Sequence, residues 1–320
     1  MTDKNNEITI QEILSARKQI QAFIRKTPLE FNEELSKKYQ SNIYLKLENL
    51  QTTGSFKIRG AFNKLKWIEK QSFAGVIAPS AGNHGIGLAY AAKQLDIEAH
   101  IYLPENTDKG KIRQLKNLNA KLKFFDDIEL ARLQAIKDAQ MNHYCFVSAY
   151  NDQQMISANG TIALEILEEL PNLDSIIIPI GGGGLSSGVS TVLKTINPEI
   201  NVIGVQTENS PTFAKWYQEN KISEVVLKSS IAEGLSGPIE QTTITFPIIQ
   251  KNVNRIVTVS ETEIKLAMKE LLNYQYIVEP SGAVGIAALK KCQSEIIGKN
   301  TAILITGQNI SWDRLIEYVK

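Results

Sequence analysis

The amino-acid sequence predicts an α/β fold that consists of two three-layer domains with mostly parallel sheets. Short apolar segments with strand character alternate with segments whose apolar residues recur at helical spacing. This alternation is typical of β-α-β units, in which helices cover both faces of a parallel sheet. The chain has 320 residues, which is enough for about two domains of ordinary size.

The first half of the chain begins with a helix and then alternates between strands and helices. Apolar residues at helical spacing predict the first helix within residues 8–24, and it ends before Pro28 because proline disfavours a helical residue in front of it. The strands are predicted at 43–48, 75–79, 98–104, 122–125 and 144–147, and the helices between them at 61–68, 86–95, 109–118 and 128–140.

The second half repeats this alternation, with one irregular region. Three prolines interrupt residues 206–250, which we expect to form short helices and loops. Ser260 and Glu263 have the spacing of a capping box and predict the start of a helix. The other helices are predicted at 155–170, 184–194 and 283–288, and the strands at 175–180, 201–205, 256–259 and 302–305.

Charge and hydropathy exclude several classes of partner. The 35 basic and 34 acidic residues give a net charge of +1, and no basic cluster stands out. Neither nucleic acid nor an anionic membrane surface is therefore an expected partner. The polar N-terminus has no apolar core of a signal peptide, and no apolar run approaches the ~20 residues of a membrane span. We expect a soluble, cytoplasmic protein.

The cysteine and histidine residues do not suggest a metal site. Cys145 and Cys292 are far apart in the sequence, so two buried thiols are expected in place of a disulfide or a zinc site. The three histidines, His84, His100 and His143, are equally dispersed. No metal is predicted.

Lys57 lies between a predicted strand and a predicted helix, just inside the helix. The polar residues Thr52, Thr53 and Ser55 signal the helix start. The positive end of a helix dipole lowers the pKa of a lysine, and a neutral lysine is a nucleophile that forms a Schiff base with an aldehyde. The alternative is a solvated lysine without a special role, which is the simpler interpretation of this segment taken alone.

Four consecutive glycines, residues 181–184, follow a buried strand and open a helix. Backbone N–H groups at a helix start bind anions, typically phosphate, and the missing side chains permit close approach. A tight turn that needs positive φ is the alternative, although such a turn rarely needs four glycines. The segment is neither a GxGxxG fingerprint nor a P-loop.

Two further turns of small residues follow predicted strands. Residues 80–85 can hold a carboxylate on backbone amides, with the Asn83 side chain free to bond a ring oxygen, or they are simply a capped turn. In residues 306–309, a hydroxyl can face a neutral ring nitrogen or cap the next turn. Ligands collect at the carboxyl ends of parallel strands. A phosphate site beside a Schiff-base lysine, without a nucleotide fingerprint, points to pyridoxal 5'-phosphate.

Residues 46–61 closely resemble the cofactor-lysine segment of the threonine/serine dehydratase (threonine ammonia-lyase) family. These are fold-type II pyridoxal-phosphate enzymes with a tryptophan synthase β-like fold, and they are related to serine racemase. Four further segments follow in the order and spacing of that family, so the resemblance covers nearly the whole chain: 80–85, 179–185, 279–283 and 306–309.

The resemblance implies a role for each matching residue. Lys57 is the expected Schiff-base lysine and catalytic residue, and it also acts as the general base. The expected cofactor-binding residues are Phe56, Lys57, Asn83, Gly181, Gly182, Gly183, Gly184, Leu185, Glu279 and Thr306. The expected substrate-binding residues are Ser80, Ala81, Gly82, Asn83 and His84, in the loop that grips the substrate carboxylate in the family.

The implied reaction is the dehydration and deamination of a 3-hydroxy amino acid, such as L-threonine or L-serine, to a 2-oxo acid and ammonia. The alternatives are racemisation, elimination on another 3-hydroxy amino acid, β-replacement as in cysteine synthases, and a non-catalytic pyridoxal-phosphate-binding protein. The resemblance further implies a homodimer or homotetramer. It implies a large cofactor-binding domain of residues 1–71 and 155–320, and a small mobile domain, 72–154, that carries the Asn83 loop.

Several positions depart from the family pattern. Ala81 stands where serine racemases carry a serine, and a methyl group cannot supply a proton to the second face of the substrate, which favours elimination. Gln206 and Thr212 stand where relatives with a divalent-cation site have acids, so that site is not expected, although Glu208 lies nearby. The residues Thr306, Gln308 and Glu233 are also unusual and leave the substrate open. The chain ends soon after residue 309, so feedback control through an added regulatory domain is not expected.

Overall fold

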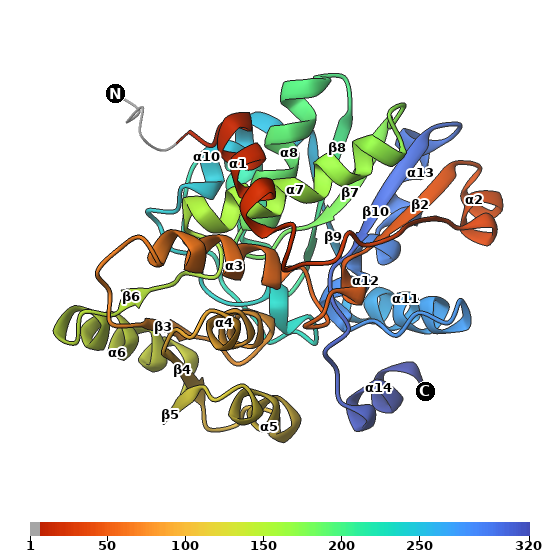
Figure 1. The fold of residues 1–320 in the computed structure, drawn as a ribbon. Helices are drawn as coiled ribbons and strands as arrows, with labels where there is room; N and C mark the ends of the chain where they lie inside the picture. The colour runs from red at the N-terminus through yellow and green to blue at the C-terminus, as the bar shows by residue number, and fades with distance from the viewer. Residues whose placement is uncertain (1–6) are drawn as a thin grey trace.

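The computed structural model describes residues 7–320 and contains two sheets, each covered by helices (Figure 1). All neighbouring strands are parallel except β1 and β2, which confirms the predicted fold class. The larger sheet has the order β1 (Leu29–Phe31), β2 (Asn42–Leu47), β10 (Asn300–Ile305), β7 (Ser175–Pro179), β8 (Asn201–Thr207), β9 (Arg255–Val259). The smaller sheet has the order β5 (Lys121–Phe125), β4 (Ala99–Pro104), β3 (Val76–Pro79), β6 (Cys145–Phe146).

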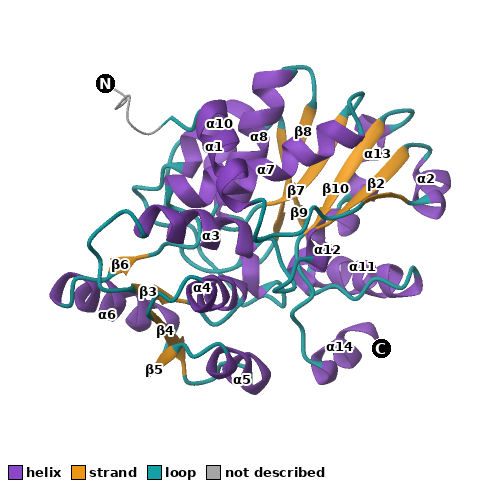
Figure 2. Cartoon of the chain, viewed as in Figure 1, coloured by secondary structure: helices purple, strands orange, loops and turns teal. Residues whose placement is uncertain are grey.

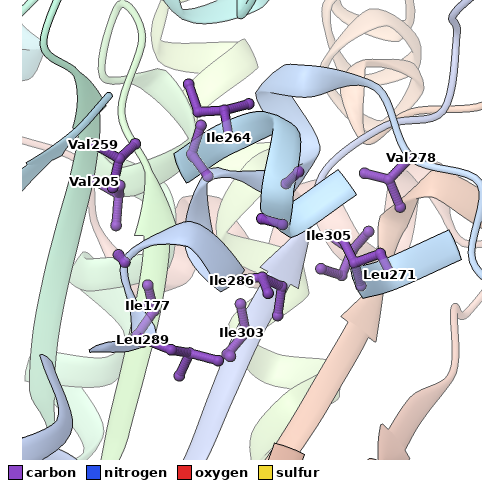
Figure 3. Close-up of a cluster of buried hydrophobic side chains, with 14 of the residues drawn as sticks. Ile177, Val205, Val259, Ile264, Leu271, Val278, Ile286, Leu289, Ile303 and Ile305 are labelled. Atoms are coloured by element: carbon purple, nitrogen blue, oxygen red, sulfur yellow. The ribbon is translucent and has the colours of Figure 1, made fainter. Parts of the chain in front are cut away.

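Two hydrophobic cores lie on opposite faces of the larger sheet. Along β10, Ile303 and Ile305 enter one core, whereas Ala302 and Leu304 enter the other, because successive side chains of a strand point to opposite faces. Figure 3 shows the first of these cores. It is covered by α2 (Glu33–Tyr39), α11 (Glu261–Asn273), α12 (Pro280–Ala287), α13 (Leu289–Ile296) and α14 (Trp312–Val319). The second is covered by α1 (Ile10–Ile20), α7 (Gln153–Glu169), α8 (Gly184–Ile196), α9 (Thr212–Glu219) and α10 (Thr245–Asn252).

The smaller sheet forms a separate group of strands (Figure 2). One face packs against α4 (Asn83–Gln94) and α5 (Lys109–Asn117), and the other packs against α6 (Ile128–Met141). Helix α3 (Lys57–Ile68) shares a core with α4 and with residues of α1 and α7. Since α1 and α7 cover the larger sheet, α3 joins the two sheets, and its first residue is Lys57.

The helix starts agree only in part with the sequence. The capping box of Ser260 and Glu263 at the start of α11 is confirmed. The prediction that Thr52, Thr53 or Ser55 caps α3 is wrong, because the N-cap is Phe56 and no side chain bonds to the helix start. Tertiary contacts hold this end instead: Phe56 N donates to Thr306 O at 3.2 Å.

Other element boundaries also differ. Helix α1 ends at Ile20, four residues before the predicted limit of the segment, and α4 begins at Asn83, three residues earlier than predicted. The sequence does not predict β1, α2, α13 or α14. Strand β1 is only three residues long and gains its partner from β2, so its local pattern carries little signal.

The remaining sequence predictions concern the cysteines, membrane-spanning helices and domain boundaries. Cys145 and Cys292 are both buried free thiols, as predicted. Between residues 7 and 320, no helix has the length and apolar character needed to cross a membrane. The strands of the smaller sheet all lie within residues 76–146, whereas the predicted domain boundaries stay a prediction.

Candidate active site

A cavity of about 530 Å³ opens where strands β3, β7 and β10 end. These are the carboxyl ends of parallel strands, where ligands of open α/β sheets collect. Every site residue named from the sequence lines this one cavity: Phe56, Lys57, Ser80, Ala81, Gly82, Asn83, His84, Gly181, Gly182, Gly183, Gly184, Leu185, Glu279 and Thr306. The fold therefore brings together segments that lie up to 250 residues apart in the sequence.

Lys57 is the first residue of α3, and its Nζ donates to the backbone carbonyl of Ala149 at 2.8 Å. The same nitrogen lies 5.1 Å from the centroid of the Phe56 ring. Burial lowers the pKa of Lys57 to about 8, and the negative charge of Glu279 opposes this shift. The direction agrees with the sequence prediction, but the main cause is burial, which the position in the sequence does not reveal.

The glycine segment forms a cradle at the start of α8. Gly183 has a φ of +85°, so only one of the four glycines is needed for its backbone conformation. A Cβ on Gly182 would lie 2.2 Å from the Tyr150 ring, and one on Gly184 would lie 2.9 Å from the Tyr150 Cα. Within the described part of the chain, the N–H groups of residues 181–183 have no hydrogen-bond acceptor. The cradle therefore fits a phosphate group beside the positive end of α8.

The loop before α4 offers a second set of free N–H groups. Ser80 Oγ accepts hydrogen bonds from Gly82 N at 3.2 Å and Gly85 N at 2.9 Å. No acceptor among residues 7–320 serves the N–H groups of Ala81, Asn83 and His84. The loop is thus a capped turn that still has donors available for a carboxylate at a helix start.

His84 is buried and neutral. Its Nε2 lies 3.0 Å from the carbonyl oxygen of Val147, so Nε2 carries the proton and donates. Its Nδ1 is buried and has no partner within the described residues. Burial, followed by the nearby charge of Lys57, lowers the pKa of His84 to about 3. The ring can therefore accept a hydrogen bond but does not supply a positive charge.

The Asn83 side chain is already held by two hydrogen bonds, which the sequence does not predict. Its Nδ2 donates to Glu279 Oε1 at 2.6 Å, and its Oδ1 accepts from Asn309 Nδ2 at 2.7 Å. One Nδ2 hydrogen is left over. Burial raises the pKa of Glu279 to about 7. The Thr306 hydroxyl makes only a long contact of 3.5 Å with the Ser281 carbonyl oxygen, so it does not cap the next turn.

Some residues of the cavity were not identified from the sequence. Ala149 orients Lys57 through its carbonyl group, and Tyr150 packs against Gly182. Both lie in a loop that contains no motif. Asn309 belongs to a predicted turn but was not assigned a role. At the cavity wall, Glu233 bridges Lys111 of α5 and Arg314 of α14.

Gln206, where the sequence predicts no cation ligand, is held by hydrogen bonds within the protein. Gln206 Oε1 accepts from Ala214 N at 2.8 Å, and Gln206 Nε2 donates to Ile180 O at 3.3 Å. Glu208 lies 3.6 Å from Lys291. In the described chain, no group of three or more His, Cys, Asp or Glu side chains is arranged to hold a metal ion.

A buried lysine beside a cradle that fits a phosphate is the arrangement expected of an α/β enzyme that uses a phosphorylated aldehyde cofactor. Residues 20–307 match the family of pyridoxal-phosphate dependent enzymes, and the chain belongs to this family. The predicted family and cofactor are thereby confirmed.

Curated relatives and solved structures agree with this assignment. The chain is 40% identical to L-threonine ammonia-lyase of Thermotoga maritima, over 95% of this chain and 76% of the relative. It is 37% identical to L-threonine dehydratase catabolic TdcB of Staphylococcus aureus strain USA300, over 96% of this chain and 91% of the relative. Maize serine racemase has a TM-score of 0.91 at 30% identity, over 97% of this chain and 96% of that chain. Threonine deaminase isoform 2 of Solanum lycopersicum has a TM-score of 0.88 at 29% identity, over 97% of this chain and 93% of that chain. The fold is that of the fold-type II pyridoxal-phosphate enzymes.

Proposed function

We propose that this protein is a lyase that uses pyridoxal 5'-phosphate to convert a 3-hydroxy amino acid, such as L-threonine or L-serine, into a 2-oxo acid and ammonia. The observation that carries this proposal is that Lys57, the glycine segment 181–184 and the loop before α4 all line one cavity. Relatives at 37% and 40% identity are named as threonine dehydratase and threonine ammonia-lyase, which supports this reaction.

The residues present fit the cofactor. The unpaired N–H groups of Gly181, Gly182 and Gly183 would hold the phosphate, with Gly184 and Leu185 at the start of α8. Lys57 would bind the aldehyde carbon, and Phe56, Asn83, Glu279 and Thr306 would surround the ring. When bound, pyridoxal phosphate supplies an electron sink for the bonds at the substrate α-carbon.

Lys57 provides the base for the reaction. With a pKa near 8, an appreciable fraction of its amine is neutral at physiological pH, so Nζ can take a proton from the substrate α-carbon. The Ala149 carbonyl accepts from the same nitrogen and restricts where it points. Burial thus both lowers the pKa of the amine and keeps bulk water from it.

The loop before α4 would orient the substrate. The free N–H groups of Ala81, Asn83 and His84 can bind the substrate carboxylate, while Ser80 holds the turn. The Ala81 methyl group has no proton to donate, which supports elimination over racemisation. Similarity to serine racemase makes racemisation the second candidate.

One assay separates these possibilities. The purified protein, loaded with pyridoxal phosphate, should release equal amounts of 2-oxo acid and ammonia from L-threonine or L-serine. Lys57→Ala should abolish both products and covalent attachment of the cofactor, which borohydride reduction and mass spectrometry would detect. Attachment to Lys57 without turnover of any 3-hydroxy amino acid would indicate a non-catalytic binding protein. Formation of D-serine from L-serine would indicate racemisation.

We further propose that residues 72–154 move relative to residues 1–71 and 155–320, and that the chain forms a homodimer or homotetramer. The Asn83 contacts to Glu279 and Asn309, which join the two sheets, support a closure at the cavity. Exposed Trp312 at the start of α14 is compatible with a subunit contact. Analytical ultracentrifugation and hydrogen exchange with and without substrate would test these two points.

A further inference from the structure

Three side chains from separate parts of the fold form one chain of hydrogen bonds at the cavity. Asn309 follows β10 of the larger sheet, Glu279 precedes α12, and Asn83 begins α4 beside the smaller sheet. Asn309 Nδ2 donates to Asn83 Oδ1 at 2.7 Å and to Thr53 O at 2.8 Å, so both of its hydrogens are used. Asn83 Nδ2 donates to Glu279 Oε1 at 2.6 Å.

The partners at each end determine which atoms donate and which accept in this series of hydrogen bonds. The backbone carbonyl of Thr53 can only accept, so the nitrogen of Asn309 must face it. That same nitrogen meets Asn83, which must therefore present its oxygen to Asn309 and its nitrogen to Glu279. A flipped Asn83 amide would therefore bring two N–H donors together at Asn309, and at Glu279 it would meet an acceptor whenever that carboxyl group is ionised.

Two glycines leave the space that this arrangement requires. A Cβ on Gly307 would lie 2.2 Å from Glu279 Oε1 and 3.1 Å from Asn83 Nδ2. A Cβ on Gly54 would lie 2.4 Å from Asn309 Oδ1, and Gly54 also has a φ of +72°. A methyl group at either position would have to displace the end of the Glu279 or Asn309 side chain, so the two glycines leave room for the observed hydrogen bonds.

We infer that Asn309 is a positioning residue, which together with Glu279 locks the Asn83 amide in the one orientation that directs its spare Nδ2 hydrogen to the ring of the cofactor. This inference rests on the proposed role of Asn83 as a cofactor-binding residue. Asn309 acts through Asn83 and is not a catalytic residue.

The sharpest variant is Asn309→Asp, because a carboxylate has nearly the same shape but cannot donate. It would place acceptors against both Asn83 Oδ1 and Thr53 O, and the Asn83 amide should turn. We expect the dissociation constant of pyridoxal phosphate from the apoprotein to rise roughly tenfold, as for loss of a buried hydrogen bond. The pH at which the visible absorption of the bound cofactor changes should also shift. Asn309→Ser is the second variant if Asn309→Asp does not fold.

A double-mutant cycle decides between positioning and general structural support. In an Asn83→Ala background, Asn309→Ala should cause no further loss of cofactor affinity and no further spectral shift, because its effect passes through the missing amide. Gln308→Ala is the matched control in the same turn; Gln308 does not line the cavity, and the variant should bind the cofactor as wild type does.

Independent effects of the Asn83 and Asn309 substitutions would overturn the inference, as would wild-type affinity and absorption in the Asn309 variants. Failure of the proposed function would look different. In that case the wild-type chain would not attach pyridoxal phosphate to Lys57, or would attach it without acting on any 3-hydroxy amino acid.

Discussion

Arg59 and Glu48 form a two-point ion pair in which both side chains are fully buried. Arg59 Nε donates to Glu48 Oε2 at 2.8 Å, and Arg59 Nη2 donates to Glu48 Oε1 at 2.7 Å. The guanidinium also bonds Glu165 of α7, and Glu165 in turn accepts from Lys46 of β2. Two buried cations thus face two buried anions and hold α3 against β2 and α7. Arg59 lies only two residues after Lys57, so this network also fixes the start of α3.

Removing one member of this network should destabilise the protein strongly. Arg59→Ala leaves two buried carboxylates without their main partner, and we expect a loss of about 3–5 kcal/mol in the free energy of unfolding. Urea denaturation followed by circular dichroism would measure it. Arg17→Ala is the control, because Arg17 pairs with Glu168 at the surface and should cost less than about 1 kcal/mol. Equal losses for the two variants would contradict this account.

Gly182→Ala should damage the phosphate site specifically. The new Cβ would lie 2.2 Å from the Tyr150 ring, so the cradle must open. We expect the affinity for pyridoxal phosphate to fall at least about tenfold, while the affinity for pyridoxal, which lacks the phosphate, changes little. Equilibrium dialysis of the apoprotein would measure both.

Gly298→Ala is the control for backbone effects of an added methyl group. Gly298 has a φ of +70° and open space around its Cβ position, so the substitution should lower stability without changing cofactor affinity. An equal loss of affinity for pyridoxal and its phosphate in Gly182→Ala would show that the loop does not hold the phosphate.

The rate at which the apoprotein takes up pyridoxal phosphate should rise with pH and level off above about 8. The neutral form of Lys57 is the nucleophile, and burial lowers its pKa to about 8. Stopped-flow absorbance would follow the reaction. Glu279→Gln should move the midpoint to lower pH, because the charge of Glu279 raises the pKa of Lys57. A midpoint near the ordinary lysine value would mean that the amine is solvated.

Glu279 should make the apoprotein less stable as the pH rises from about 4.5 to 7. Its pKa in the folded state is raised to about 7 by burial, whereas the unfolded chain ionises near the ordinary value of 4.5. The folded state therefore binds more protons in this window, and the stability that this provides at low pH is lost as the pH rises through 7. Relative to Glu279→Gln, the wild type should lose roughly 3 kcal/mol across the window. Parallel pH profiles of the two proteins would rule out a buried, titrating Glu279.

Ala81→Ser should add racemisation to the elimination reaction. A hydroxyl at this position places a proton donor in the loop that lines the cavity, where the wild type has a methyl group. Chiral chromatography of the products from L-serine should then detect D-serine, and the same measurement on wild type should detect much less. Gln308→Ser, outside the cavity lining, is the control. An unchanged product ratio in Ala81→Ser would mean that residue 81 does not face the reacting carbon.

Local sequence patterns determined the fold class, the order of most strands and helices, and the segments that form the cavity. Apolar periodicity reports burial on two faces of a sheet, and small residues after a strand report a turn where ligands can approach. Residues that carry such a pattern, such as Lys57 and Gly182, can be assigned to the site from the order of amino acids alone.

The tertiary structure alone decided how the polar side chains are paired and charged. The bond between Asn83 and Glu279 joins residues 196 positions apart, and that between Asn309 and Asn83 joins residues 226 positions apart. The low pKa of Lys57 and the raised pKa of Glu279 both follow from burial by distant segments. Hydrogen bonds and desolvation act over a few ångströms of space, and the chain sequence does not state which distant residues come that close.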